Sequence, residues 1–132
     1  MFQKKILVLL GPSVTDLKSI HYALSLAERL KAQVYIFQAM AIAGIQDSLS
    51  LWQRETLSDL ITSARQAGFT VSHHITDGEI KEELIGLVKT ENIDFIVFGA
   101  EDKVYERLLH QLKSLVMAQI IQVKEKHQIH YL

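Results

Sequence analysis

Short continuous runs of hydrophobic residues alternate along this chain with longer segments of helical periodicity. The first run, residues 6–10, is Ile-Leu-Val-Leu-Leu and is bounded by Gly11 and Pro12. An apolar run of this length is typical of a strand buried on both faces of a parallel sheet. Apolar, β-branched and aromatic runs predict four further strands, at residues 33–37, 69–75, 94–98 and 118–123.

The segments between these strands predict four helices. A helix over about residues 14–31 follows Ser13 and Asp16, which have the spacing of a capping box. After a loop at 39–45, a second helix covers 46–67 and ends at the C-cap glycine Gly68. A third helix begins after a capping box of Thr76 and Glu79 and ends near Glu91, and a fourth has an apolar face of Val104, Leu108, Leu112 and Leu115.

The strict alternation of strands and helices indicates an α/β fold. We expect a three-layer, open, doubly wound parallel sheet of five strands in the order 3-2-1-4-5, with right-handed crossovers and helices on both faces. A chain of 132 residues with 48% hydrophobic residues can bury one core, and no linker or internal repeat is visible. Residues 1–132 are therefore predicted to form a single domain.

Charge and composition narrow the classes of function. The net charge is −1, with 14 basic and 15 acidic residues mixed along the chain, which disfavours a nucleic-acid partner. There is no cysteine to form a disulfide or a thiolate site. The apolar run near the N-terminus is too short to span a membrane and lacks a cleavage site, so we expect no membrane insertion and a cytoplasmic location.

Two loops are the candidate positions for a ligand, because open doubly wound sheets bind ligands beyond the carboxyl ends of their central strands. They begin at Gly11 and at Gly99. Neither is a complete phosphate cradle: the glycines of a P-loop or a dinucleotide fingerprint are missing, and Pro12 removes one backbone donor. The candidate cofactor-binding residues are Gly11, Ser13, Gly99, Ala100 and Asp102.

We expect no catalytic residue and no metal site. His73 and His74 are neighbours on a strand, where they point to opposite faces, and His127 and His130 have no carboxylate or thiolate beside them. Ser13 lacks a base to activate it, and helix capping explains its presence. The chain is therefore predicted not to be an enzyme.

Four segments together resemble the universal stress protein family: Lys5-Ile-Leu-Val8, the helix Ala23-Leu-Ser-Leu-Ala27 with Leu30, Lys31-Ala-Gln-Val34, and Asp94-Phe-Ile-Val-Phe-Gly99. Their order and spacing extend the resemblance over nearly the whole chain. It implies that family's five-stranded, adenine nucleotide alpha hydrolase-like fold, a homodimer and a role in stress adaptation.

The resemblance fails at the nucleotide site. Members that bind ATP typically carry an aspartate at the end of the first strand, where this chain has Gly11 or Leu10. Their Gly-x-x-Gly, nine residues, Gly-Ser/Thr loop follows the fourth strand, and here Gly99 is the last glycine of the chain. The remaining loop positions hold Asp102, Leu112 and Lys113. The resemblance therefore implies the branch with a degenerate ATP-binding loop.

Two hypotheses for the function follow. The first is a non-enzymatic, homodimeric stress-response domain that acts through contacts with other proteins and needs no cofactor. The alternative is an adenine-nucleotide switch, in which Gly99, Ala100 and the backbone N–H groups of the Ser13 helix hold ATP or AMP, with magnesium bridging Glu101 or Asp102. Nucleotide hydrolysis is disfavoured, because the sequence shows neither a positioned base nor a phosphate-clamping arginine.

Association is expected through the fifth strand, which stands at a sheet edge in the predicted order. Its residues Ile120, Ile121 and Val123 would leave backbone groups unpaired, so we predict that they pair with a second copy. The tail, residues 128–132, again alternates polar and apolar residues. A second possibility is therefore that the tail extends or covers this edge.

Overall fold

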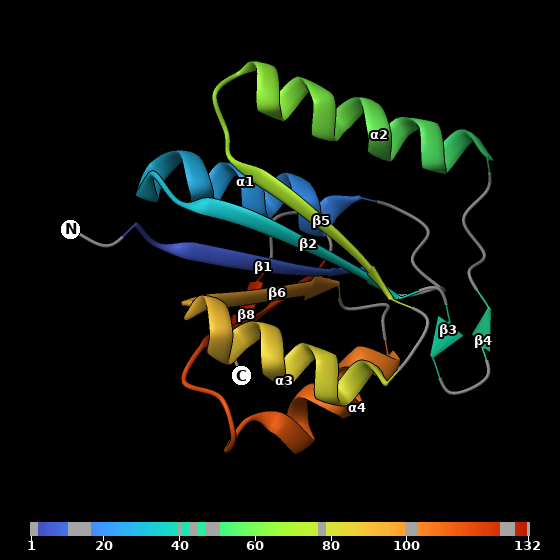
Figure 1. Cartoon of the computed structure of the whole chain (residues 1–132), viewed down its shortest axis with the longest axis vertical. Coiled ribbons are helices and arrows are strands. Elements are labelled where there is room, and N and C mark those ends of the chain that lie inside the picture. The colour runs from blue at the N-terminus through green and yellow to red at the C-terminus, as the bar shows by residue number, and fades with distance from the viewer. Residues whose placement is uncertain are drawn as a thin grey trace.

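The computed structural model of the chain describes residues 3–10, 17–39, 41–42, 45–46, 51–76, 79–99, 103–124 and 129–131 (Figure 1). Within these residues the main sheet contains β1 (Lys5–Leu10), β2 (Gln33–Ala39), β5 (Val71–Thr76), β6 (Phe95–Gly99), β7 (Gln119–Val123) and β8 (Ile129–Tyr131). Strands β3 (Ala41–Ile42) and β4 (Ile45–Gln46) form a separate small hairpin. The described helices are α1 (Lys18–Leu30), α2 (Leu51–Gln66), α3 (Ile80–Glu91) and α4 (Lys103–Leu112).

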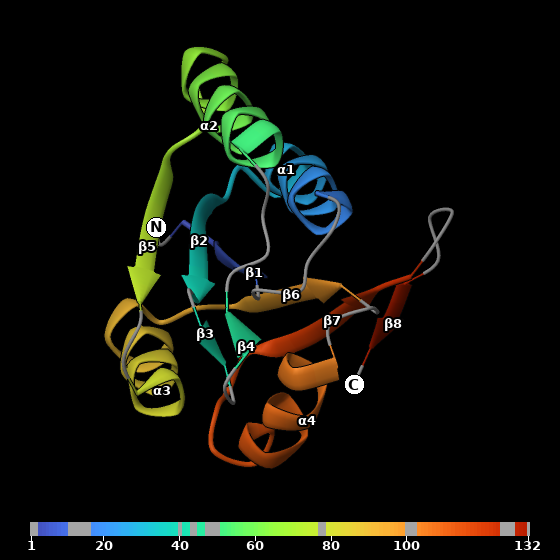
Figure 2. The same ribbon diagram turned by 90° about the vertical axis from the view of Figure 1, so that its right-hand side faces the viewer.

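The order of strands in the sheet is β5-β2-β1-β6-β7-β8, and the first five are parallel. The predicted order 3-2-1-4-5 is therefore confirmed, with one strand added at the end. Helices α1 and α2 cover one face of the sheet, and α3 and α4 cover the other (Figures 1 and 2). The change of face falls between the central strands β1 and β6.

Strand β1 explains why its sequence is apolar without interruption. Ile6 and Val8 face the core formed with α1 and α2, and Leu7 and Leu9 face the core formed with α3 and α4. All four side chains are fully buried. The strand therefore contributes to two hydrophobic cores at once, which is the arrangement expected for the centre of a parallel sheet.

The ends of the helices agree only in part with the sequence patterns. Gly68 follows α2 in a left-handed conformation (φ 99°), as predicted, and Lys31 and Asn92 adopt the same conformation after α1 and α3. The capping box predicted with Thr76 as the N-cap is wrong: the N-cap of α3 is Glu79, and the Glu79 side chain makes no capping hydrogen bond. Instead the Thr76 hydroxyl donates to the carboxylate of Glu83, which lies four residues after the predicted partner, Glu79. Ser13 and Asp16 lie outside the described residues.

Two other boundaries differ from the prediction. The start of the predicted helix 46–67 is β4, so the hairpin of β3 and β4 replaces part of a predicted loop and part of a predicted helix. Helix α4 ends at Leu112, and Leu115, expected on its apolar face, lies beyond the helix and is 52% exposed. Its buried face is formed by Tyr105, Leu109 and Leu112, whereas Leu108 is only half-buried.

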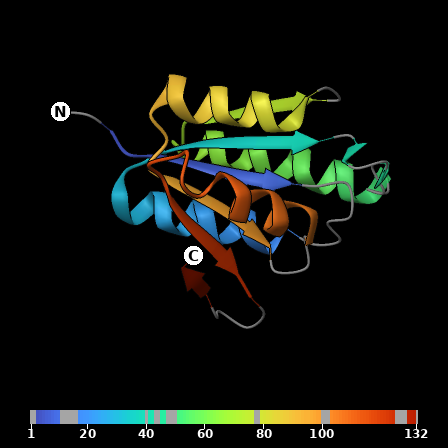
Figure 3. The ribbon, with the colours of Figure 1, turned by 90° about the horizontal axis from the view of Figure 1, so that it is seen from below.

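The C-terminal tail forms β8, which runs antiparallel to β7 (Figure 3). It pairs with Ile121, Gln122 and Val123. The prediction that the fifth strand stands at the sheet edge is therefore wrong, and the possibility that the tail covers that edge is confirmed. The half-buried side chain of Ile129 packs against the core shared with α1, which gives the tail its hydrophobic anchor.

None of the helices in the described part of the chain combines the length and the apolar composition needed to cross a membrane.

Candidate functional site

The carboxyl ends of the parallel strands meet at one end of the sheet, the end that carries the β3–β4 hairpin in Figure 1. Because the helices change face between β1 and β6, this is where an open doubly wound sheet binds ligands. Of the predicted site residues, the structure describes Gly99, which ends β6 and lies opposite Val123 of β7. Gly11, Ser13, Ala100 and Asp102 lie outside the described residues, so their predicted roles stay predictions.

Tyr105 of α4 lies beside the carboxyl end of β1. Its side chain is fully buried in the core shared with α3, and its hydroxyl donates a hydrogen bond to the carbonyl oxygen of Leu10 at 3.4 Å. Residues 95 positions apart are joined by this contact. A large aromatic ring therefore fills the α4 side of the sheet next to the point where the helices change face. The sequence contained a signal for this buried face, because Tyr105, Leu109 and Leu112 have a helical spacing, as the predicted face with Val104 does.

Leu112 occupies a position that, by the family resemblance, belongs to a glycine of the phosphate loop. In the structure it is the last residue of α4, and its side chain is 1% exposed. Its backbone N–H is within the helical hydrogen-bonding pattern, where it points along the helix axis to the preceding turn. Such an N–H cannot also bind a phosphate oxygen.

A buried glutamine of β2, Gln38, contacts a half-buried histidine of β5, His73. His73 Nε2 lies 2.9 Å from the side-chain oxygen of Gln38, and the Gln38 side chain is almost fully buried. Burial lowers the pKa of His73 below 6.5, and the nearby charges of Arg65 and His74 lower it further. A neutral imidazole with its proton on Nε2 can donate to the Gln38 oxygen.

Thr76 and Gln122 are further buried polar residues near the carboxyl ends of the described strands. Thr76, the last residue of β5, donates to Glu83 of α3, and Gln122 is in β7, between Ile121 and Val123. The sequence did not lead us to predict a role for Gln38 or Gln122, and Thr76 was predicted only as a helix cap. A signal was present, since each is a polar residue at the end of an otherwise apolar or β-branched run, where ligand-facing residues of such sheets lie.

The histidines give no support for a metal site. Among the described residues, no group of three or more histidine, aspartate or glutamate side chains is close enough to hold an ion. His73 faces Gln38, whereas His74 lines a cavity against α3, so the two point to opposite faces as predicted. His127 and the side chain of His130 lie outside the described parts.

The cavity beside α3 has a volume of about 320 Å³. It lies between β5 and α3, and its lining is mainly apolar and includes Phe37 of β2. Gly86, in the middle of α3, forms part of its wall. This cavity was not predicted, because no sequence pattern shows which two elements leave a gap between them.

A model of the universal stress protein family matches residues 3–121 of this chain. A search of curated proteins found no match. Among solved structures, a universal stress protein family protein from Burkholderia pseudomallei is 21% identical, with a TM-score of 0.62, and the match covers 91% of this chain and 95% of that one. The universal stress protein from Archaeoglobus fulgidus in complex with dAMP is 16% identical, with a TM-score of 0.61, and the match covers 92% and 98%.

A third structure, a universal stress protein in complex with cAMP, is 18% identical, with a TM-score of 0.62 and coverage of 92% of this chain and 97% of that one. At these identities the structural likeness establishes the fold. The match to the family model rests on the sequence alone and covers most of the chain, so it supports the same relationship independently of the structure.

Proposed function

Because the chain belongs to the universal stress protein family, we propose that it acts in the stress response as a non-enzymatic homodimer in the cytoplasm, through contacts with other proteins and without binding nucleotide. The family assignment supports the general role. The absence of nucleotide binding, the dimer and the cytoplasmic location are finer parts of the proposal, and the first two have separate tests.

The observation that carries the nucleotide-free function is the position of Leu112. A phosphate loop needs backbone N–H groups that are free and approachable, which is why such loops are rich in glycine. Here the position of the third loop glycine is a buried leucine at the end of a helix, and the chain has no glycine after Gly99. Tyr105 packs in the same core cluster, so the helix is held against the sheet where the loop would have to open.

The alternative function is an adenine-nucleotide switch that uses Gly99, Ala100 and Asp102 with magnesium. The structures in complex with dAMP and cAMP, which have the same fold, favour it. A switch of this kind would have to hold phosphate without the glycine loop. Its metal would have to offset the repulsion between the nucleotide and the acidic residues after β6.

The dimer that we propose uses a different edge from the one expected from the sequence. Strand β8 pairs with Ile121 to Val123, so these residues have no free backbone edge for a second copy. The outer edge of β8 is not paired with any described strand. We therefore propose that two copies meet along β8, with Ile120 and the rest of β7 one strand behind the contact.

Isothermal titration with ATP, ADP and AMP, with and without Mg²⁺, tests the nucleotide-free function. We expect no heat of binding over micromolar to millimolar ligand. The A. fulgidus protein titrated with dAMP under the same conditions is the positive control. Stoichiometric binding to this chain would overturn the proposal and make the switch the better function. Light scattering tests the dimer separately, and a monomer mass at all concentrations would exclude it.

A further inference from the structure

Strand β5 has an open outer edge. It is the first strand in the sheet order, and on its outer side no strand of the described residues pairs with it. Val34 N–H donates to the carbonyl of Thr70 at 2.9 Å, so the backbone groups of residues 70, 72 and 74 point toward β2. Since the direction alternates along a strand, the N–H and C=O groups of Val71, His73 and Ile75 point outward.

Among the described residues, the charged side chain that binds the backbone of this edge lies at its amino end. Arg65 of α2 donates from Nε and Nη2 to the carbonyl oxygen of Val71, at 3.1 and 2.9 Å. No hydrogen bond within the described part of the chain reaches the outward groups of His73 and Ile75. Ile75 is also 60% exposed. Exposed edges are normally blunted along their length by charges, proline or a bulge, so an uncovered edge with an exposed isoleucine indicates a surface for strand addition.

The cavity of about 320 Å³ lies directly beside this open segment, with Ile75, His74 and Thr76 on one side and α3 on the other. Gly86 widens it. A Cβ atom added at Gly86 would meet nothing within 4 Å, and its backbone has ordinary helical geometry. Glycine inside a helix is less stable than alanine, so neither packing nor backbone geometry explains this residue. What it provides is room between the helix and the strand edge.

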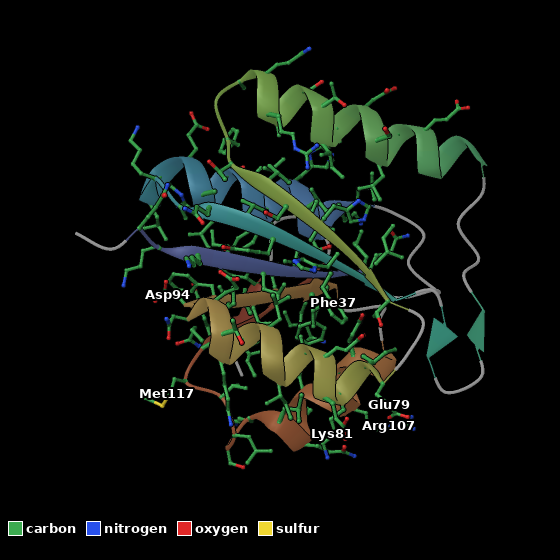
Figure 4. The ribbon with its side chains drawn as sticks, viewed as in Figure 1. Phe37, Glu79, Lys81, Asp94, Arg107 and Met117 are labelled. Carbon is green, nitrogen blue, oxygen red and sulfur yellow. The ribbon has the colours of Figure 1, made fainter. Side chains whose placement is uncertain are left out.

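The charges along α3 are arranged so that they would orient a peptide in this groove. Helix α3 follows β5 in the chain and returns along it, so its first turn lies at the carboxyl end of β5 (Figure 4). Glu79 precedes that first turn, which contains Glu82 and Glu83 together with Lys81, so its net charge is negative. The last turn contains Lys89 and Glu91, and the Glu91 carboxylate is paired with Lys5 at 3.4 Å. Arg65 is at the same end as Lys89, because it binds Val71 at the start of β5. The groove is therefore negative at one end and positive at the other.

We propose that this groove binds an extended peptide segment of a partner protein, which adds to β5 as an antiparallel strand. Its backbone would pair with His73 and Ile75, and one apolar side chain would enter the cavity over Gly86. In this orientation its amino end faces Glu82 and Glu83, where lysine or arginine is favoured, and its carboxyl end faces Lys89 and Arg65, where acidic residues are favoured. The inference deepens the proposed function, since it specifies the partner for its protein contacts.

Fluorescence anisotropy with two labelled peptides tests this inference on the full chain. The first peptide has lysines before a central Val-Leu-Val and glutamates after it; the second has the same composition with the charges exchanged. We expect the first to bind at least about tenfold more tightly than the second. The variant Glu82→Lys with Lys89→Glu changes only exposed positions and should reverse this preference. A reversal cannot result from unfolding.

Two pairs of variants test the groove and the edge. Gly86→Leu fills the cavity and should lower the affinity for the first peptide at least about tenfold, whereas Gly86→Ala should change this affinity much less. Ile75→Pro removes an outward N–H without breaking the ladder to β2, and Ile75→Thr keeps that N–H as the matched control. Binding should be lost in the proline variant and retained in the threonine variant, with unchanged circular dichroism in both.

Three outcomes would overturn the inference. They are equal affinity for the two peptides, binding that is insensitive to Gly86→Leu and Ile75→Pro, and loss of the homodimer in Gly86→Leu, which would assign the groove to a second copy of this chain. None of these outcomes changes the result of the nucleotide titration, so a failure here is distinguishable from a failure of the proposed nucleotide-free function.

Discussion

The carboxylate of Asp94 accepts a hydrogen bond from the backbone N–H of Lys5 at 2.9 Å, and the N–H of Asp94 donates to the carbonyl of Lys5 at the same distance. Asp94 immediately precedes β6, and Lys5 begins β1. The two residues therefore close the amino ends of the central strand pair. The ion pair of Asp94 with Lys4, at 3.9 Å, is more exposed and contributes little.

We expect Asp94→Ala to lower the free energy of unfolding by about 1–2 kcal/mol, because a hydrogen bond to a charged acceptor is lost in a half-buried position. Urea denaturation followed by circular dichroism measures the change. Asp94→Asn is the matched control: it keeps an acceptor oxygen, so its loss in the free energy of unfolding should be about half that of Asp94→Ala. An alanine variant as stable as the parent would show that water replaces the carboxylate without cost.

Tyr105 gives a second test, since its ring and its hydroxyl can be removed separately. The ring is fully buried, so Tyr105→Ala should destabilise the protein by about 3–5 kcal/mol through the cavity that it leaves. Tyr105→Phe keeps the ring and removes the hydroxyl with its long hydrogen bond to Leu10, at 3.4 Å, so its cost should stay below about 1 kcal/mol. Thermal unfolding of the two variants under identical conditions separates these effects.

A loss of similar size in both variants would assign most of the contribution of Tyr105 to its hydroxyl. In that case the contact of the hydroxyl with the end of β1, rather than the packing of the ring in the core shared with α3, would hold α4 on this part of the sheet.

Sequence patterns predicted the central part of this fold better than its periphery, for a physical reason. A strand such as β1 is buried by both cores, so each of its residues is apolar and the pattern is local. The predicted apolar face of α4 began at Val104, whereas the buried face begins one residue later, at Tyr105. Both residues have a helical spacing to Leu112, so the pattern alone did not distinguish them. A tyrosine can be buried or exposed, and only the packing around it decides which.

The pairing of the tail with β7 could not be deduced with certainty from a local pattern. Residues 129–131 make only three ladder positions, and their anchors are distant in sequence: the core shared with α1 for Ile129 and a hydrogen bond with Tyr22 for Tyr131. The candidate site was predicted on loops, and of its residues the described structure contains Gly99. The buried polar residues Gln38 and Gln122 lie within strands, where an apolar environment was expected.

Removal of β8 is the next prediction. A chain that ends at Lys124 exposes the backbone edge of β7 together with Ile121 and Val123, which are buried in the full chain. An uncovered apolar edge favours pairing between molecules. We expect the shortened protein to show a larger average mass than the full chain in light scattering, rising with concentration. The same mass for both proteins would indicate that β7 is protected by something other than β8.

The pKa of His73 predicts how stability depends on pH. Because burial lowers this pKa below 6.5 in the folded protein, the unfolded chain binds a proton at His73 more readily than the folded chain does. The stabilisation is complete above the unfolded pKa, and it is lost as the pH falls from about 6.5 through the folded pKa. We therefore expect the free energy of unfolding to decrease between about pH 7 and pH 5 more steeply in the parent than in His73→Gln.

Urea unfolding curves at several pH values measure both slopes, and the difference between them isolates His73 from the other histidines. Parallel slopes would mean that burial and the nearby charges of Arg65 and His74 do not hold His73 neutral in the folded protein.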